Sequence, residues 1–191
     1  PPPPPPPPSP PPPPPPPPRS PTLFPSTTLF RSDGPTAGLV DATAAAIVLD
    51  ESPLPGAGDG VRTATADYSV NFAATTDFGT DGPGGVSYAL ALSANGIGSG
   101  LFALGAGGAQ GAEILLSQAG GTITGSVGGT DYFTIAVDAG TGIVTFTQLN
   151  NIWHSNTGDH DDAEALVADG TLSLVQTVTD ADGDSDTAAL D

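Results

Sequence analysis

The residues with the clearest chemical potential are four aspartates near the end of the sequence. Asp180, Asp182, Asp184 and Asp186 recur at every second position around Gly183. On an extended strand this spacing puts all four side chains on one face, with neighbours about 6.6–6.8 Å apart, where they repel one another. The run is therefore either a solvated edge or is bent at Gly183, because glycine permits the bend that lets several oxygens converge on a hard cation. Calcium is the cation that takes roughly six to eight oxygen ligands.

The acidic run partly matches the calcium loop of an EF-hand. The four aspartates fall at the first, third, fifth and seventh positions of that loop, and Asp191 falls at the twelfth. Ser185 stands where the loop requires glycine, Asp191 replaces the bidentate glutamate, and no flanking helix is predicted. We therefore predict that the four aspartates bind calcium through another loop geometry. A solvated acidic edge that resists pairing between strands is the alternative.

The first 32 residues do not read as evolved sequence. Seventeen of the first eighteen are proline, and residues 22–32 look like the translation of a common sequencing adapter, with Ser26 in place of the expected tyrosine. We interpret residues 1–32 as a disordered segment that is a sequencing artefact and exclude it from fold reasoning. The alternative is a proline-rich linker or SH3-type ligand.

The rest of the chain is strongly acidic. Two of the three basic residues, Arg19 and Arg31, lie in the excluded segment, which leaves Arg62 against 21 carboxylates and a net charge of −20. Nucleic acid is excluded as a partner because phosphate binding requires Lys and Arg, and anionic membrane surfaces are disfavoured for the same reason. No apolar run is long enough to insert into a membrane, which needs about 20 residues. The charge points to cations as ligands.

The absence of cysteine excludes disulfides, thiolate metal sites and a cysteine nucleophile. A chain of about 150 residues can form a core without such links. No pattern typical of hydrolases is present: there is no Gly-x-Ser-x-Gly motif and no phosphate-binding loop, since the chain has no lysine. We therefore predict that the protein is not an enzyme.

Apolar and polar residues alternate from residue 60 onward, which is typical of half-buried strands. Strands are predicted for Val61–Phe72, for a segment carrying Val86, Tyr88, Leu90 and Leu92, and for Thr171–Thr179. A hairpin is predicted from Tyr132–Val137 and Ile143–Leu149, joined by a glycine-containing turn. Shorter candidate strands are Ala44–Leu49, Leu101–Leu104, Glu113–Ser117 and Thr122–Val127. Many short strands separated by glycine-rich turns favour a sandwich or barrel, and the aromatic residues are expected in its core.

Two other groups of acidic residues are weaker candidates for metal sites. Residues 159–162, with His154 nearby, contain imidazole and carboxylate ligands that suit zinc, but a solvated polar loop is favoured. Asp50, Glu51 and Asp59 are weaker candidates for calcium ligands at the other end of the module.

Several motifs together resemble the long repeat module of giant type I secreted, RTX-type bacterial adhesins, which is similar to VCBS and cadherin-like repeats. The resemblance covers about Leu49 to Asp191 and rests on an ordered series of segments: Leu49–Ser52, Gly58–Tyr68, Gly129–Ile135, Gly142–His154 and Val175–Asp186. The Gly-Gly-x-Gly-x-Asp repeat of the calcium β-roll is absent, so the chain is not that element.

The resemblance implies an all-β fold, an immunoglobulin-like or cadherin-like β-sandwich over residues 49–191. Residues 33–48 then form an inter-repeat linker or the tail of a preceding repeat, and the acidic run lies at the exit of the module, facing the next one. The implied function is an extracellular, calcium-stiffened structural repeat of a cell-surface adhesin that serves attachment and biofilm, with neighbouring repeats of the same chain as partners. The alternative is an adhesive module that binds a surface carbohydrate or a host protein.

Overall fold

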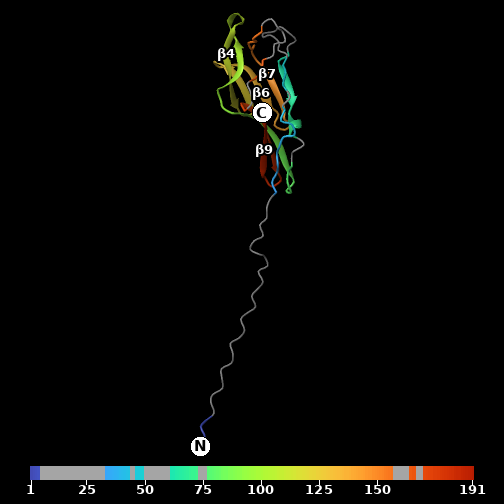
Figure 1. Ribbon diagram of the computed structural model, residues 1–191, viewed down its shortest axis with the longest axis vertical. Helices are drawn as coiled ribbons and strands as arrows, with labels where there is room; N and C mark the ends of the chain where they lie inside the picture. Colours follow the sequence, from blue (N-terminus) through green and yellow to red (C-terminus); the bar gives the residue numbers. More distant parts are fainter. Residues whose placement is uncertain (5–32, 44–45, 50–60, 73–76, 157–163, 167–169) are drawn as a thin grey trace. The chain divides into compact units, whose positions relative to one another are not determined.

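A computed structural model describes residues 1–4, 33–43, 46–49, 61–72, 77–156, 164–166 and 170–191 (Figure 1). The chain divides into two compact units, residues 1–31 and 32–191. Residues 1–4 are the described part of the first unit, so the predicted disorder of residues 1–32 falls almost wholly outside the described residues. Every strand reported below belongs to the second unit.

The second unit is built from antiparallel strands in two sheets. The larger sheet has the order β1-β7-β6-β5-β4-β3 and the smaller has the order β2-β8-β9. Two short 3₁₀ segments, η1 (Ser69–Asn71) and η3 (Ala106–Gly108), accompany the strands. The strands are β1 (Thr63–Asp67), β2 (Pro83–Leu92), β3 (Ile97–Leu104), β4 (Gln110–Ala119), β5 (Thr122–Val127), β6 (Thr130–Val137), β7 (Ile143–Gln148), β8 (Leu172–Asp180) and β9 (Ser185–Leu190).

The hydrophobic core draws on both sheets. Buried side chains from the larger sheet pack with those from the smaller one, so each sheet hides one face and exposes the other. Several large side chains are fully buried in this core, namely Phe72, Ile114, Leu116, Ile123, Phe133 and Val178. The fold is therefore all-β and β-sandwich-like, as the alternation predicted. None of the helical segments in the described ranges is long and apolar enough to cross a membrane.

The period of two predicted several strands accurately. In β2, Tyr88 and Leu90 are buried and Val86 and Leu92 are half-buried, as their spacing requires. The predicted hairpin is formed by β6 and β7, and its turn is closed by Asp138, whose carboxylate accepts hydrogen bonds from the backbone of Gly140 and Thr141. The predicted strand Thr122–Val127 has the same bounds as β5.

Two strand predictions are wrong in part. Val61–Phe72 was expected to be continuous, but β1 ends at Asp67, whose carboxylate accepts hydrogen bonds from the backbone and hydroxyl of Ser69 and so turns the chain into η1. As a result Val70 is 66% exposed, although its place in the alternation put it in the core. Of the predicted strand Ala44–Leu49, residues 46–49 are described and form no strand.

The incoming segment, residues 33–43, is attached to the sandwich by backbone hydrogen bonds. Thr36 forms a bridge with Asp77, and the Val40 N–H donates to the Asn71 carbonyl at 2.7 Å. The side-chain amide of Asn71, itself buried, donates to the carbonyls of Asp41 and Thr43. The segment thus packs against the module, and its assignment within residues 33–48 as a linker stays a prediction.

The pairing of Gly125 with Phe133 generates a test of the core. Phe133 is fully buried, and a Cβ added at Gly125 would overlap its ring. Replacing Gly125 with alanine should lower the free energy of unfolding by about 1–3 kcal/mol, since overpacking forces the ring or backbone to move. Chemical denaturation measures the change. Gly121→Ala is the matched control, because a Cβ there meets open space. Equal free energies of unfolding for the two variants would contradict the close packing of Phe133 against Gly125.

Candidate metal centre

The acidic run forms the turn of the β8–β9 hairpin. Val178 pairs with Asp186 and Thr179 with Ser185, and the Asp180 N–H donates to the Asp184 carbonyl at 3.0 Å. Gly183 has a φ of 101°, a backbone conformation that L side chains rarely adopt. The run is therefore bent at Gly183 and does not form one straight carboxylate face.

Asp180 is the buried member of the run. Its side chain is 2% exposed, and its Oδ1 accepts hydrogen bonds from the N–H groups of Gly183 at 3.0 Å and Asp184 at 2.8 Å. These bonds fix the turn. Its other oxygen, Oδ2, is buried and has no hydrogen-bond partner. A buried carboxylate oxygen without a partner is costly, and a cation is the group that removes this cost.

A carboxylate from a different part of the chain, that of Asp81, lies near the carboxylate of Asp180. Asp81 lies in the turn before β2, and β2 pairs with β8 so that Pro83 stands opposite Asp180. The Ala181 N–H donates to the Gly82 carbonyl at 3.0 Å, which joins the two turns. At Gly84 a Cβ would overlap the Asp180 carbonyl, so glycine is required for this close approach.

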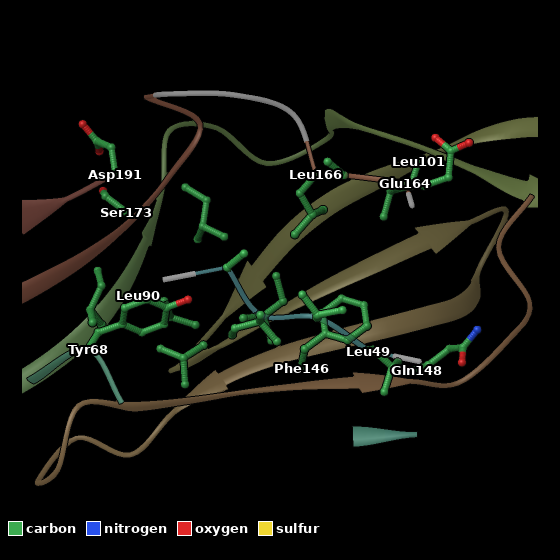
Figure 2. A pocket seen from close by; sticks show the side chains of 18 of the residues that line it. Leu49, Tyr68, Leu90, Leu101, Phe146, Gln148, Glu164, Leu166, Ser173 and Asp191 are labelled. Atoms are coloured by element: carbon green, nitrogen blue, oxygen red, sulfur yellow. The ribbon is translucent and has the colours of Figure 1, made fainter. Parts of the chain in front are cut away.

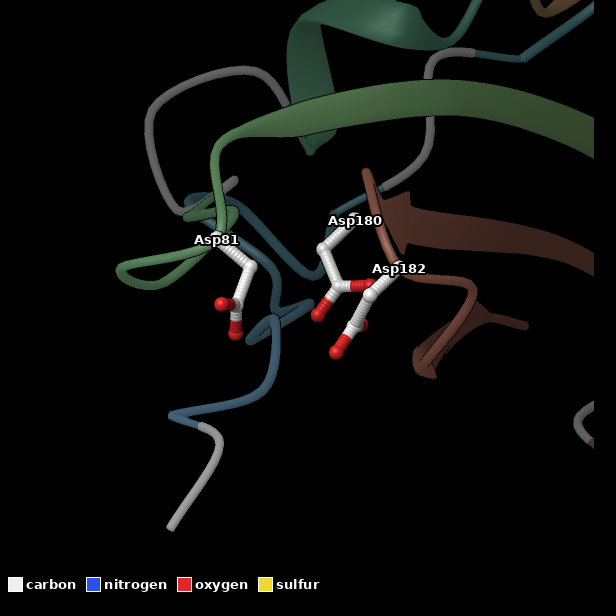
Figure 3. A group of neighbouring side chains, drawn as sticks. All are labelled: Asp81, Asp180 and Asp182. Carbon is white, nitrogen blue, oxygen red and sulfur yellow. The ribbon is translucent and has the colours of Figure 1, made fainter. Parts of the chain in front are cut away.

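The three carboxylates of Asp81, Asp180 and Asp182 gather at one place (Figure 3). Each offers an oxygen, and these oxygens all lie within 4.8 Å of one another. Oxygens on opposite sides of a calcium ion, each bonded at about 2.3–2.6 Å, are about 4.6–5.2 Å apart. The spacing therefore fits a single ion. The donors are all carboxylate oxygens, which suits a hard cation such as calcium or magnesium better than zinc.

Electrostatics at the cluster change the acidity of Asp182. Its pKa is raised, first because its carboxyl hydrogen-bonds with that of Asp180 and second because of partial desolvation. The negative charges of Asp180 and Asp81 also raise the pKa of Asp182, whereas a hydrogen bond from the backbone N–H of Asp184 lowers it. The site thus holds negative charges that repel one another in the absence of a cation.

The other two aspartates of the run have different contacts. Asp184 contributes its backbone to the turn, and Asp186 Oδ2 accepts a hydrogen bond from the Ala37 N–H at 2.9 Å. That bond is the main reason why the pKa of Asp186 is lowered. Neither carboxylate belongs to the three-residue cluster. Asp186 instead anchors the incoming segment to β9.

This arrangement differs from the expected position of the acidic run in the module. The run was expected at the exit, facing the next module, but its turn lies beside Ala37 of the incoming segment. β9 leads away from it, since Leu190 pairs with Leu174 in the middle of the smaller sheet. Because β9 reverses the chain direction, the acidic turn adjoins the entrance of the domain.

Comparison with known proteins places the domain in a family. A family model described as a domain of unknown function, DUF5801, matches residues 32–191. The chain belongs to the DUF5801 family. No curated protein and no solved structure matches it. The matched range includes the incoming segment, in agreement with its hydrogen bonds to the sandwich.

Sequence reasoning found part of the candidate site in this DUF5801 domain. Asp180 and Asp182 come together as expected, whereas Asp81 was not among the predicted ligands. Asp81 could be recognised as a ligand only once the pairing register of β2 with β8 was known. Of the weaker acidic groups, Asp50, Glu51, Asp59 and residues 159–162 lie outside the described residues, and His154 is half-buried beside a cavity.

The raised pKa of Asp182 predicts a pH-dependent effect of its removal. A carboxyl whose pKa is raised by folding favours the folded state most at low pH and loses that advantage as the pH rises through the folded pKa. In EDTA, Asp182→Asn should therefore raise the unfolding midpoint at pH 7, and the gain should shrink as the pH falls below the raised pKa. Thermal unfolding from pH 3.5 to 7.5 measures this (roughly the window of carboxyl titration).

The control for this series is Asp131→Asn, an exposed aspartate on β6 outside the cluster. If the rise in unfolding midpoint caused by Asp182→Asn is the same at every pH, or equals that of the control, the carboxylates do not repel one another.

Proposed function

We propose that this domain is an extracellular structural repeat of a large, type I secreted RTX-type bacterial adhesin, stiffened by calcium and serving surface attachment. Its partners are neighbouring repeats of the same chain, and it carries no catalytic activity. The proposal unites the motif resemblance with one structural observation. Asp180 is buried with one oxygen lacking a hydrogen-bond partner, and the carboxylates of Asp81 and Asp182 lie close to the carboxylate of Asp180.

Three further properties support the proposal. The protein has no cysteine, so its stability outside the cell does not depend on disulfides. Its formal net charge is −18, which opposes a compact state until cations neutralise part of it. Since a preformed carboxylate cluster binds cations only when folded, the binding free energy becomes folding free energy. These features suit a chain that folds where calcium is abundant.

The stiffening role follows from what the acidic turn touches. The same turn carries Asp180 and Asp182, pairs with the loop of Asp81, and is followed by Asp186, which holds the backbone of Ala37. A cation at the cluster would link the loops before β2 and after β8, next to the bound incoming segment. We infer that calcium restrains the chain at the entrance of the module.

Calcium should raise the thermal unfolding midpoint of the full chain. Extracellular calcium modules bind at about 10⁻⁴–10⁻³ M, so about 10 mM calcium adds about 1.4–2.7 kcal/mol, or about 3–10 °C. Calorimetry in EDTA and in calcium measures the shift. Asp81→Asn, Asp180→Asn and Asp182→Asn should each reduce it, whereas Asp138→Asn in the β6–β7 turn should keep it. No shift in the unmodified protein would overturn the proposal.

A second candidate function, carbohydrate binding by an adhesive module, is supported by an outward-facing aromatic pair. Ala103 and Ile152 form a bridge and are both buried, so their neighbours Phe102 and Trp153 project to the opposite face. The two rings meet edge to face at 6.4 Å, and both side chains are half-buried. Leu104 beside them is 43% exposed. Aromatic side chains next to exposed apolar surface are typical of recognition sites.

Trp153 provides a direct test of this second function, because it is the single tryptophan of the chain. A sugar that stacks on the pair should change the Trp153 emission, and Trp153→Ala should abolish retention on an array of neutral oligosaccharides. Leu115→Ala, an exposed apolar residue on β4, should leave retention unchanged. If no oligosaccharide is retained and the emission stays constant, the carbohydrate function is excluded while the calcium result stands.

A further inference from the structure

A cavity of about 600 Å³ lies between the two sheets (Figure 2), and none of the residues of the carboxylate cluster lines it. Its volume is within the range of roughly 300–1,000 Å³ typical of small-molecule sites. Its inner wall is mainly apolar and is contributed by six different strands. The wall residues that decide its character are all buried, namely Leu90, Leu101, Ile135, Val144, Leu174 and Leu190.

The opening of the cavity is bordered by two segments without regular structure. Residues 46–49 bring Ile47, and residues 164–166 bring Leu166; both side chains are half-buried and pack against the core. Glu164 Oε1 accepts a hydrogen bond from the Ser155 N–H at 2.9 Å, which fixes the second segment. Apolar side chains thus line most of the cavity, and the polar side chains of Tyr68, Gln148 and His154 line the remainder together with those at the rim.

The carboxylates among the lining residues lie on Glu164 and Asp191, and both residues are exposed. His154, Gln148 and Ser173 are neutral polar residues that also line the cavity, and no lysine or arginine is among the described lining residues. Arg62 is the one basic side chain of residues 33–191, and it does not line the cavity. A carboxylate or phosphate head group would meet like charges at this rim, whereas a cationic head group would be attracted.

We propose that this cavity binds a single-chain cationic amphiphile, with the hydrocarbon chain between the sheets and an ammonium head group beside Glu164. Burial of the chain supplies the affinity, because apolar surface leaves water. The head group supplies the selectivity. The site shares no residue with the cluster of Asp81, Asp180 and Asp182.

Isothermal titration calorimetry on the full chain tests the proposal, with decyltrimethylammonium and decanoate as probes below their micelle concentrations and at physiological ionic strength. The ammonium should bind with one molecule per chain and at least about tenfold more tightly than decanoate. Glu164→Gln should reduce the ratio between the affinity for decyltrimethylammonium and the affinity for decanoate. Leu166→Trp should weaken both probes by about tenfold or more, because the larger ring fills the cavity.

The control is Leu115→Trp, which changes an exposed residue on β4 outside the cavity and should leave binding unchanged. Because an acidic protein attracts any cation, tetramethylammonium serves as a second control. It has no long hydrocarbon chain, so its binding measures the attraction of the head group to the protein alone. Binding of many ammonium ions per chain, equal affinity in Leu166→Trp and the unmodified protein, or no binding would each overturn the proposal. Because Glu164 is exposed, Glu164→Gln is expected to fold. It therefore still tests the role of charge if Leu166→Trp does not fold.

Discussion

The burial of one carboxylate constrains the whole acidic end of this domain. Asp180 is almost fully buried because β2 and β9 flank β8 on both sides and the turn closes over it. One of its oxygens holds that turn through two N–H groups, so the side chain cannot leave without losing the turn. The other oxygen is buried beside the carboxylates of Asp81 and Asp182, which makes this end of β8 strongly negative. The glycines at 84 and 183 and the approach of Asp81 are consistent with this position, because the backbone at 84 passes close to the Asp180 carbonyl and the chain turns at 183.

The hydrophobic core and the carboxylate cluster make separate contributions to stability. Side chains from both sheets interlock without any cysteine, so the sandwich has an apolar source of stability that needs no ion. The cluster instead sets a local electrostatic cost at one edge of the smaller sheet. A cation there would therefore adjust the stability of an existing fold, in contrast to small metal domains that are unfolded without their ion.

The sequence predicts what depends on neighbouring residues and fails where distant segments meet. Alternation located β2, β5 and the β6–β7 hairpin, because one buried face imposes a period of two. It failed after Asp67, where a side-chain hydrogen bond to Ser69 competes with the strand. At the candidate site, the bend at Gly183 was predictable from the residue type. The contribution of Asp81 was not, since it depends on the pairing of β2 with β8.

The spacing of the four aspartates has a different meaning in a hairpin than in a straight strand. A straight strand would keep all four carboxylates on one face, as a single array. When the chain reverses at Gly183, the two aspartates before the glycine remain together and meet Asp81, while Asp186 moves onto β9 and bonds to Ala37. One repeated residue type thus supplies ligands on one side of the turn and an anchor on the other. The pKa of Asp186 is lowered, mainly by the bond from Ala37, whereas the pKa of Asp182 is raised, first by the hydrogen bond of its carboxyl with that of Asp180.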